Sequence, residues 1–193
     1  LPAFNATLFL SANEEDVKAA LDNGYAAGRV LNKIVVEDDD SNELRIGFDF
    51  DGVLADDEAE KIYKETGDLK QFHQHEEAHA QEPLKIGPVG GLLKAISNLQ
   101  KLEQQKHQEN PSYQPILKTA IITARNAPAH ERMINTLKAW NVDVDEAFFL
   151  GGINKARVLN ILKPHIFFDD QMVHLDHIDK IPAVHIPFGV GNK

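Results

Sequence analysis

Two aspartates, two residues apart, follow an apolar run in the first third of the chain. Asp49 and Asp51 come directly after residues 44–48, and Gly52 follows them. Ligands of open α/β sheets bind beyond the carboxyl ends of the strands, so a strand over residues 44–48 would place both carboxylates where chemistry is expected. Close carboxylates repel each other unless a cation or a proton neutralises them, and Mg²⁺ prefers such oxygen ligands. A polar turn after a buried strand is the alternative interpretation.

Three more groups of polar residues follow apolar runs later in the chain. They are Thr123 after residues 116–122, Lys155 after residues 148–152, and Asp169 with Asp170 after residues 166–168. Taken singly, each has an ordinary explanation: a helix cap, a solvated lysine and a polar turn. Taken together and in this order, they predict a phosphoryl-transfer site, which needs charge neutralisation around the phosphoryl oxygens and an in-line nucleophile.

Each of these side chains suits one role in that chemistry. Asp49 is the candidate nucleophile, because an aspartyl-phosphate divides one difficult step into two. Asp51 could protonate the leaving alkoxide and then activate water. Thr123 would donate its hydroxyl to a phosphoryl oxygen, and Lys155 would supply positive charge and steady the nucleophile. The predicted ligands of a bridging Mg²⁺ are Asp49, Asp51, Asp169 and Asp170.

These motifs resemble the four motifs of the haloacid dehalogenase superfamily, in the same order. More narrowly, the chain resembles the cytosolic 5′-nucleotidase type I family over most of its length. The segments that carry the narrower resemblance are His75-Glu-Glu-Ala-His79 with Pro83 and Gly87-Pro88, Thr123-Ala124-Arg125, and residues 164–172 and 185–190. The resemblance implies Mg²⁺-dependent hydrolysis of a nucleoside 5′-monophosphate to nucleoside and phosphate.

The composition limits the partners of such a site. The formal charge of −10 and the pI near 5.3 argue against a nucleic-acid surface, since such domains carry a basic face. An anionic substrate therefore needs a local positive pocket, which Arg125, Lys155 and Mg²⁺ can form beside Thr123 and Ala124. The chain has no cysteine, which excludes disulfides and thiolate chemistry.

The sequence also predicts where the protein works. No apolar run approaches the roughly 20 residues that span a bilayer, and no basic segment followed by an apolar core, as in a signal peptide, opens the chain. We therefore expect a cytoplasmic protein with no membrane partner.

Apolar and amphipathic segments alternate along most of the chain. Strands are expected at residues 6–10, 29–37, 44–48, 116–122, 148–150, 166–168 and 183–186, and helices from Ser11 and over residues 128–141 and 155–162. In the second of these helices, Met133, Leu137 and Trp140 are spaced to face a core. The alternation predicts an α/β fold with a parallel sheet and helices on both faces, which the resemblance makes a Rossmann-like sheet.

Residues 57–115 break the alternation. They are polar and rich in His and Gln, with residues 104–113 expected as an exposed loop. By resemblance this insert is a small, mainly helical cap over a core formed by residues 44–56 and 116–193. A cap excludes water from the phosphoryl pocket and adds specificity groups. Phe72, His75 and His79 could contact the base or ribose, or could simply pack within the cap.

The insert also contains a rival motif. Residues 75–79 satisfy the pattern in which two histidines one helical turn apart bind Zn²⁺ and Glu76 acts as the base, as in zinc peptidases. A catalytic zinc needs a third protein ligand, and the extended motif requires Gly and His where this chain has Glu82 and Lys85. Phosphoryl chemistry is the favoured interpretation. A non-catalytic nucleotide sensor is a third class, although every catalytic residue type of the superfamily is present.

The lead-in, residues 1–43, carries one further expectation. Its first 31 residues resemble an interior stretch of the nucleotidase family, and a strand over residues 6–10 has no obvious partner in so short a segment, although a lone edge strand exposes unpaired backbone groups. We expect the chain to be a piece of a longer protein. The other half would pack against residues 1–36, or a homo-oligomer would cover them.

Overall fold

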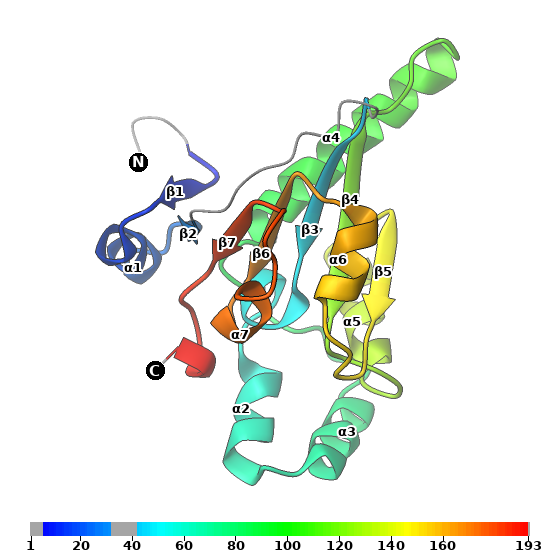
Figure 1. Ribbon diagram of the computed structural model, residues 1–193. Coiled ribbons are helices and arrows are strands. Elements are labelled where there is room, and N and C mark those ends of the chain that lie inside the picture. Colours follow the sequence, from blue (N-terminus) through cyan, green and yellow to red (C-terminus); the bar gives the residue numbers. More distant parts are fainter. Residues whose placement is uncertain (1–5, 32–41, 193) are drawn as a thin grey trace.

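A seven-stranded sheet runs through the computed structural model, which describes residues 6–31 and 42–192 (Figure 1). The strand order is β1-β2-β7-β6-β3-β4-β5, and every neighbouring pair is parallel except β2 with β7. The strands are β1 (Phe9–Ser11), β2 (Ala27–Val30), β3 (Leu44–Phe48), β4 (Leu117–Thr123), β5 (Glu146–Phe149), β6 (Ile166–Asp169) and β7 (Ala183–His185). The predicted α/β fold with a mostly parallel sheet is confirmed.

The central strands end in register. Phe48 of β3 pairs with Ile121 of β4 on one side and with Phe168 of β6 on the other. The rings of Phe48 and Phe168 stack with their centroids 5.2 Å apart. Because the three strands are parallel, the polar residues that follow them meet at one edge of the sheet.

Helices cover both faces of the sheet. On one face, α4 (Gly90–Glu109) and α5 (His130–Ala139) pack against alternate strand residues, and on the other α6 (Ala156–Leu162) and α7 (Met172–Leu175) pack against the residues between them. Met133 and Leu137 are buried and Trp140 is partly buried against the same core, as their helical spacing predicted.

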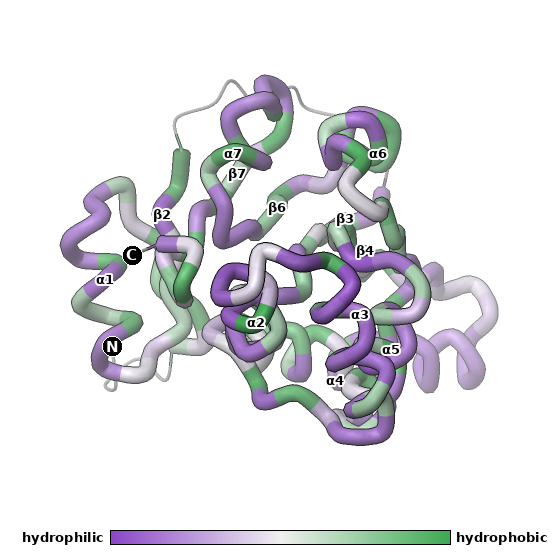
Figure 2. Tube along the Cα trace, turned by 90° about the horizontal axis from the view of Figure 1, so that it is seen from below, coloured by the Kyte–Doolittle hydropathy of each residue, from purple (hydrophilic) through white to green (hydrophobic). Residues whose placement is uncertain are grey.

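A pair of helices lies beyond the carboxyl ends of the strands. They are α2 (Glu58–Thr66) and α3 (Leu69–Ala78), which Figure 1 shows below the sheet and Figure 2 shows projected over it. The pair fits a mainly helical cap. The predicted insert also includes α4, whose Leu93 and Ile96 belong to the core beneath the sheet, so the proposed boundaries at residues 57 and 115 remain a prediction.

The expected loop over residues 104–113 is largely wrong. Helix α4 continues to Glu109, and its last turns project past the sheet (Figure 1). Its end is rich in Gln, Lys and Glu, which are good helix formers even when nothing covers them. Polarity alone therefore did not indicate a loop.

The first strand has a partner within the chain. β1 pairs in parallel with β2, and α1 (Glu14–Asp22) connects them, burying Val17 and Ala20 against Ala27. The expectation that this strand lacks a partner was wrong. The second strand was expected at residues 29–37, but β2 begins at Ala27, where it pairs with β1. Residues 32–37 of the predicted second strand lie outside the described residues.

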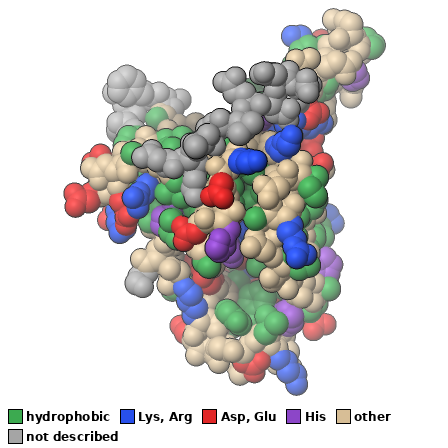
Figure 3. All heavy atoms as spheres, in the orientation of Figure 1, with side chains coloured by type: hydrophobic (Ala, Val, Ile, Leu, Met, Phe, Trp, Pro, Cys, Tyr) green, Lys and Arg blue, Asp and Glu red, His purple; other side chains and the backbone are tan. Residues whose placement is uncertain are grey.

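None of the helices in the described ranges is both long enough and apolar enough to cross a lipid bilayer. On the face of the molecule drawn in Figure 3, basic side chains of the described residues lie interspersed with acidic ones.

Candidate active site

Asp49 lies at the carboxyl end of β3 and begins a tight turn, residues 50–54. It is nearly buried, its Oδ1 accepts a hydrogen bond from the Phe50 amide at 2.7 Å, and its own amide donates to the Phe168 carbonyl at 2.8 Å. The other carboxylate oxygen, Oδ2, lies 2.8 Å from Lys155 Nζ. Burial raises the pKa of Asp49 to about 7, although Lys155 opposes the shift.

Lys155 joins two of the predicted acids. Its ammonium lies 2.8 Å from Asp49 Oδ2 and 2.7 Å from Asp169 Oδ2, and the side chain is 2 % exposed. Burial alone would lower the pKa of Lys155, but the charges of Asp169 and Asp49 raise it above its ordinary value. Lys155 is therefore a fixed cation beside the candidate nucleophile.

The two members of the acid doublet face different surroundings. Asp169 accepts hydrogen bonds from Lys155 and from the Gln171 amide, and His174 Nδ1 lies 3.2 Å from both of its oxygens. Burial favours protonation of Asp169, but Lys155 and His174 outweigh it and lower the pKa. Asp169 is thus satisfied by protein groups.

Asp170 is fully buried, and neither of its carboxylate oxygens has a hydrogen-bond partner among the described residues. Burial, followed by the charges of Asp49 and Asp169, raises its pKa to about 9. Gly52 has a φ of 71°, and a Cβ there would lie 2.7 Å from Asp170 Oδ2, so only glycine leaves room for this carboxylate. A buried carboxylate without a donor is suited to a cation.

The acidic cluster can hold a metal ion. Ligand atoms of Asp49, Asp169 and His174 lie within 4.8 Å of one another. Since Asp169 is already engaged by Lys155 and a backbone amide, the unpartnered oxygens of Asp170 are the freer donors beside Asp49. Carboxylate oxygens of this kind fit a hard divalent cation.

Asp51 pairs with Arg125 rather than with Lys155. Its two oxygens receive parallel hydrogen bonds from Arg125 Nε and Nη2, both 2.7 Å long. Such a fork fixes the geometry of the carboxylate as well as its charge. Arg125 thus engages both oxygens, while 22 % of the Asp51 side chain stays exposed. The role of Asp51 as a metal ligand stays a prediction.

The turn after β4 brings the remaining predicted phosphate contacts together. Thr123 is buried and its Oγ1 accepts the Arg125 amide at 3.2 Å, whereas Ala124 is exposed. Arg125 is itself buried, and the ring centroid of Phe72 lies 5.8 Å from its guanidinium carbon. Helix α3 thus reaches the edge of the site.

Comparison with known proteins agrees with these motifs. A family model described as 5′-nucleotidase matches residues 1–193. Human cytosolic 5′-nucleotidase 1B is 33% identical over 185 residues, which are 95% of this chain and 30% of that protein. The chain belongs to the 5′-nucleotidase family. It spans less than a third of the length of this relative.

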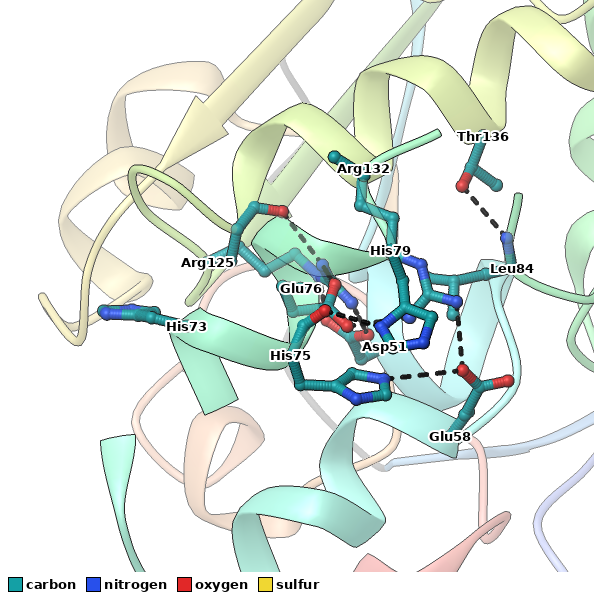
Figure 4. Close-up of polar contacts among 12 residues, drawn as sticks. Asp51, Glu58, His73, His75, Glu76, His79, Leu84, Arg125, Arg132 and Thr136 are labelled. Carbon is teal, nitrogen blue, oxygen red and sulfur yellow. Dashed lines mark hydrogen bonds and ion pairs between the residues drawn. The ribbon is translucent and has the colours of Figure 1, made fainter. Parts of the chain in front are cut away.

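The histidines of the zinc motif do not form a zinc site in this 5′-nucleotidase family member. The rings of His75 and His79 stack with centroids 4.1 Å apart, and His79 Nδ1 lies 2.8 Å from the His75 carbonyl. Glu76, which would have to act as the base, is fully buried between Arg125 and Arg132 (Figure 4). Through Glu76 the motif ties α3 to Arg125 and Arg132 by ion pairs. This geometry does not support the zinc-peptidase alternative. His75 and His79 lie beside Glu58 of α2 (Figure 4).

Sequence reasoning missed three residues near the site. His174 contacts Asp169, Arg132 pairs with Glu76, and Glu60 of α2 is close enough to Asp170 to raise its pKa. For Arg132, the available signal was a charged residue on the core-facing side of an amphipathic helix. Nothing in the sequence distinguished His174 or Glu60 from surface residues.

Proposed function

We propose that this chain carries the catalytic site of a Mg²⁺-dependent 5′-nucleotidase that hydrolyses nucleoside 5′-monophosphates through an aspartyl-phosphate. The observation that carries the proposal is the contact of Asp49 with Lys155, beside the unpartnered carboxylate of Asp170. A nucleophile, a fixed cation and a free acidic ligand at the ends of parallel strands are what phosphoryl transfer requires.

In the first step, an oxygen of Asp49 attacks phosphorus as the bond to the ribose 5′-oxygen breaks. Asp51 in its protonated form gives its proton to that oxygen, and the nucleoside leaves. Thr123 and the backbone amide of the exposed residue Ala124 would donate to phosphoryl oxygens, while Lys155 would offset the negative charge around Asp49.

In the second step, Asp51 takes a proton from a water molecule, which attacks the phosphorus of the aspartyl-phosphate. The Asp49 carboxylate leaves and inorganic phosphate forms, so Asp51 has regained its proton and the site is restored. Lys155 again steadies Asp49 in its ionised form.

Mg²⁺, the ion we propose here, would be held by Asp49 and Asp170, and when bound it neutralises charge between nucleophile and phosphate. The fit rests on the two buried oxygens of Asp170, which lack donors within the part of the chain that the structure describes. Asp169 would act by fixing Lys155.

Nucleoside contacts are proposed for the cap. Phe72 lies near the Arg125 guanidinium, and His73 Nε2 lies 3.0 Å from Asn126 Oδ1, so α3 borders the phosphate turn. Phe72 could stack on a base. His75 and His79 are turned toward Glu58 and each other, which makes them weaker candidates for substrate contact.

The human relative is named a cytosolic enzyme, and we propose the same compartment for this protein. Substrates would then be free nucleotides, with neither nucleic acid nor membrane as a partner. Self-association, or association with further parts of a longer protein, would most simply involve the β1 edge of the sheet.

A phosphate-release assay tests the proposal. The purified full natural protein is incubated with a panel of nucleoside 5′-monophosphates and sugar phosphates, with Mg²⁺ or with chelator. We expect Mg²⁺-dependent release from nucleotides. Equal release from sugar phosphates would defeat the nucleotide assignment and leave a general phosphatase, and no release from any substrate would defeat the enzyme assignment.

A further inference from the structure

Glu76 is a buried carboxylate for which the reaction proposed above has no direct use. It is the only buried residue of α3, a helix that otherwise presents half-buried or exposed side chains. One of its oxygens pairs with Arg125 Nη1 and the other lies 2.8 Å from Arg132 Nη1 (Figure 4). The cap helix is thus attached to the core by a charge rather than by an apolar side chain.

Arg125 connects this carboxylate to the site. Its Nη1 donates to Glu76 and to the Ala129 carbonyl, while Nε and Nη2 donate to Asp51. A guanidinium has five N–H donors, so four of them are committed to protein acceptors. The side chain is 2 % exposed, which leaves a phosphate little access to it.

The direction of the fork matters for Asp51. Arg125 is almost fully buried, whereas part of the Asp51 side chain stays exposed. A planar guanidinium held at one end by Glu76 presents its other edge in a single orientation. The position of the Asp51 carboxylate therefore depends on a contact made by α3.

We propose that Glu76 is a positioning residue for proton transfer: it fixes Arg125, and Arg125 holds the Asp51 carboxylate toward the leaving group. The inference rests on the proposed function, in which Asp51 is the acid and base. It replaces substrate binding as the role of Arg125. Because Glu76 comes from the cap, Asp51 is aligned only when α3 is docked on the core.

The test compares substrates with different leaving groups in the Glu76→Gln variant of the full natural protein. Glutamine keeps the shape but loses the charge, and its amide nitrogen, which can only donate, cannot accept from the second arginine. A ribose 5′-oxygen needs a proton to leave, whereas p-nitrophenolate does not. With Mg²⁺, kcat/KM for a nucleoside monophosphate should fall about 10- to 100-fold, and kcat/KM for p-nitrophenyl phosphate should fall by about threefold or less.

Two controls separate positioning from general damage. Glu77→Gln changes the exposed neighbour on the same helix and should leave both rates unchanged. Arg132→Met removes the other partner of Glu76 but leaves Glu76 paired with Arg125, and so leaves α3 docked and the fork onto Asp51 in place; it should lower thermal stability but not reproduce the selective loss on the nucleotide.

The outcomes are distinct. An equal loss on both substrates in Glu76→Gln, no loss at all, or the same selective loss in Arg132→Met would overturn the inference while leaving the proposed function intact. If the unaltered protein hydrolyses neither substrate, the proposed function fails. A crystal structure of Glu76→Gln in which Arg125 still forks onto Asp51 would also contradict the positioning role.

Discussion

Two clusters of buried charge lie side by side at the carboxyl ends of the strands, and they differ in how completely they are satisfied. At the junction of α3 with the sheet domain, Glu76 pairs with two arginines and Arg125 pairs with two carboxylates. In the strand-end cluster, Lys155 contacts Asp49 and Asp169, and Asp170 has no donor among the described residues. Buried charge without a partner is costly.

The difference separates structural from chemical roles. A saturated network can fix geometry and gains nothing from a ligand. A cluster with surplus negative charge gains from a cation, and binding to the folded state then stabilises the protein. Under the proposed function, the strand-end cluster would bind the metal ion and react, while the junction would align it.

The strongest test of the contrast is Asp49→Asn. An amide cannot form the acyl-phosphate, so turnover of nucleoside monophosphates should fall by at least about three decades. The fold should survive, because the change removes one negative charge from a cluster that has an excess of them, and Lys155 still pairs with Asp169. Phosphate release and thermal melting measure the two effects. Beryllium fluoride with Mg²⁺ should bind at Asp49 in the unaltered protein as a phosphoryl mimic. Substantial turnover in the Asp49→Asn variant would assign the nucleophile to another residue.

Lys155→Met should have the next largest effect. It removes the cation beside the nucleophile, which costs about two to three decades in kcat. It also leaves Asp49 and Asp169 facing each other without a counter-charge, so the melting temperature should fall as well. Rates must therefore be compared well below the melting transition. A variant with near-native kcat would show that Lys155 only balances charge in the resting protein.

These candidate site residues could be chosen from the sequence, because each follows directly on a local apolar run. Apolar runs at residues 44–48 and 166–168 end in acids, and parallel pairing of β3 with β6 brings those ends together without further information. The fold class followed from the same alternation. Most of the catalytic candidates could therefore be chosen before the strand order was known.

Other features depend on contacts between distant residues, which the sequence does not display. Glu76 and Arg125 are 49 positions apart, so the HExxH match did not show that Glu76 pairs with two arginines, and the sequence did not show that Arg125 pairs with Glu76. The two members of the acid doublet have identical side chains, and only the location of Lys155 and His174 beside Asp169 distinguishes them. The end of α4 was missed because an uncovered polar helix has no apolar stripe.

Asp170→Asn tests the metal assignment with a smaller expected effect. In metal-free protein the variant should be more stable than the unaltered chain, since it removes a buried carboxylate that has no partner. Saturating Mg²⁺ at about 100 times its dissociation constant should stabilise the unaltered protein by roughly 2.7 kcal/mol. The variant should show little of this gain. Melting curves with Mg²⁺ and with chelator give both results, and an equal gain in the two proteins would place the ion elsewhere.

The smallest effect on stability is expected for Glu58, where the ion-pair network around Glu76 reaches solvent. Glu58 Oε1 lies 3.0 Å from Arg132 Nη2, but 40 % of the Glu58 side chain is exposed, so Glu58→Gln should cost less than about 1 kcal/mol of unfolding free energy. Burial favours protonation of Glu58, but Arg132 outweighs it and lowers the pKa below its ordinary value of 4.5. The contribution is therefore complete above pH 4.5 and is lost as the pH falls through the lowered value.

Chemical denaturation of Glu58→Gln and the unaltered protein at pH 7 and at pH 3 measures that contribution. The two free energies of unfolding should differ slightly at pH 7 and converge at pH 3, and added salt should reduce the difference at pH 7 because the pair is exposed. Glu65→Gln, an exposed change on the same helix, serves as the control. A cost for Glu58→Gln as large as that of Glu76→Gln would mean that the junction is held at its rim rather than at its buried carboxylate, and α3 would then be docked by a contact that Asp51 does not share.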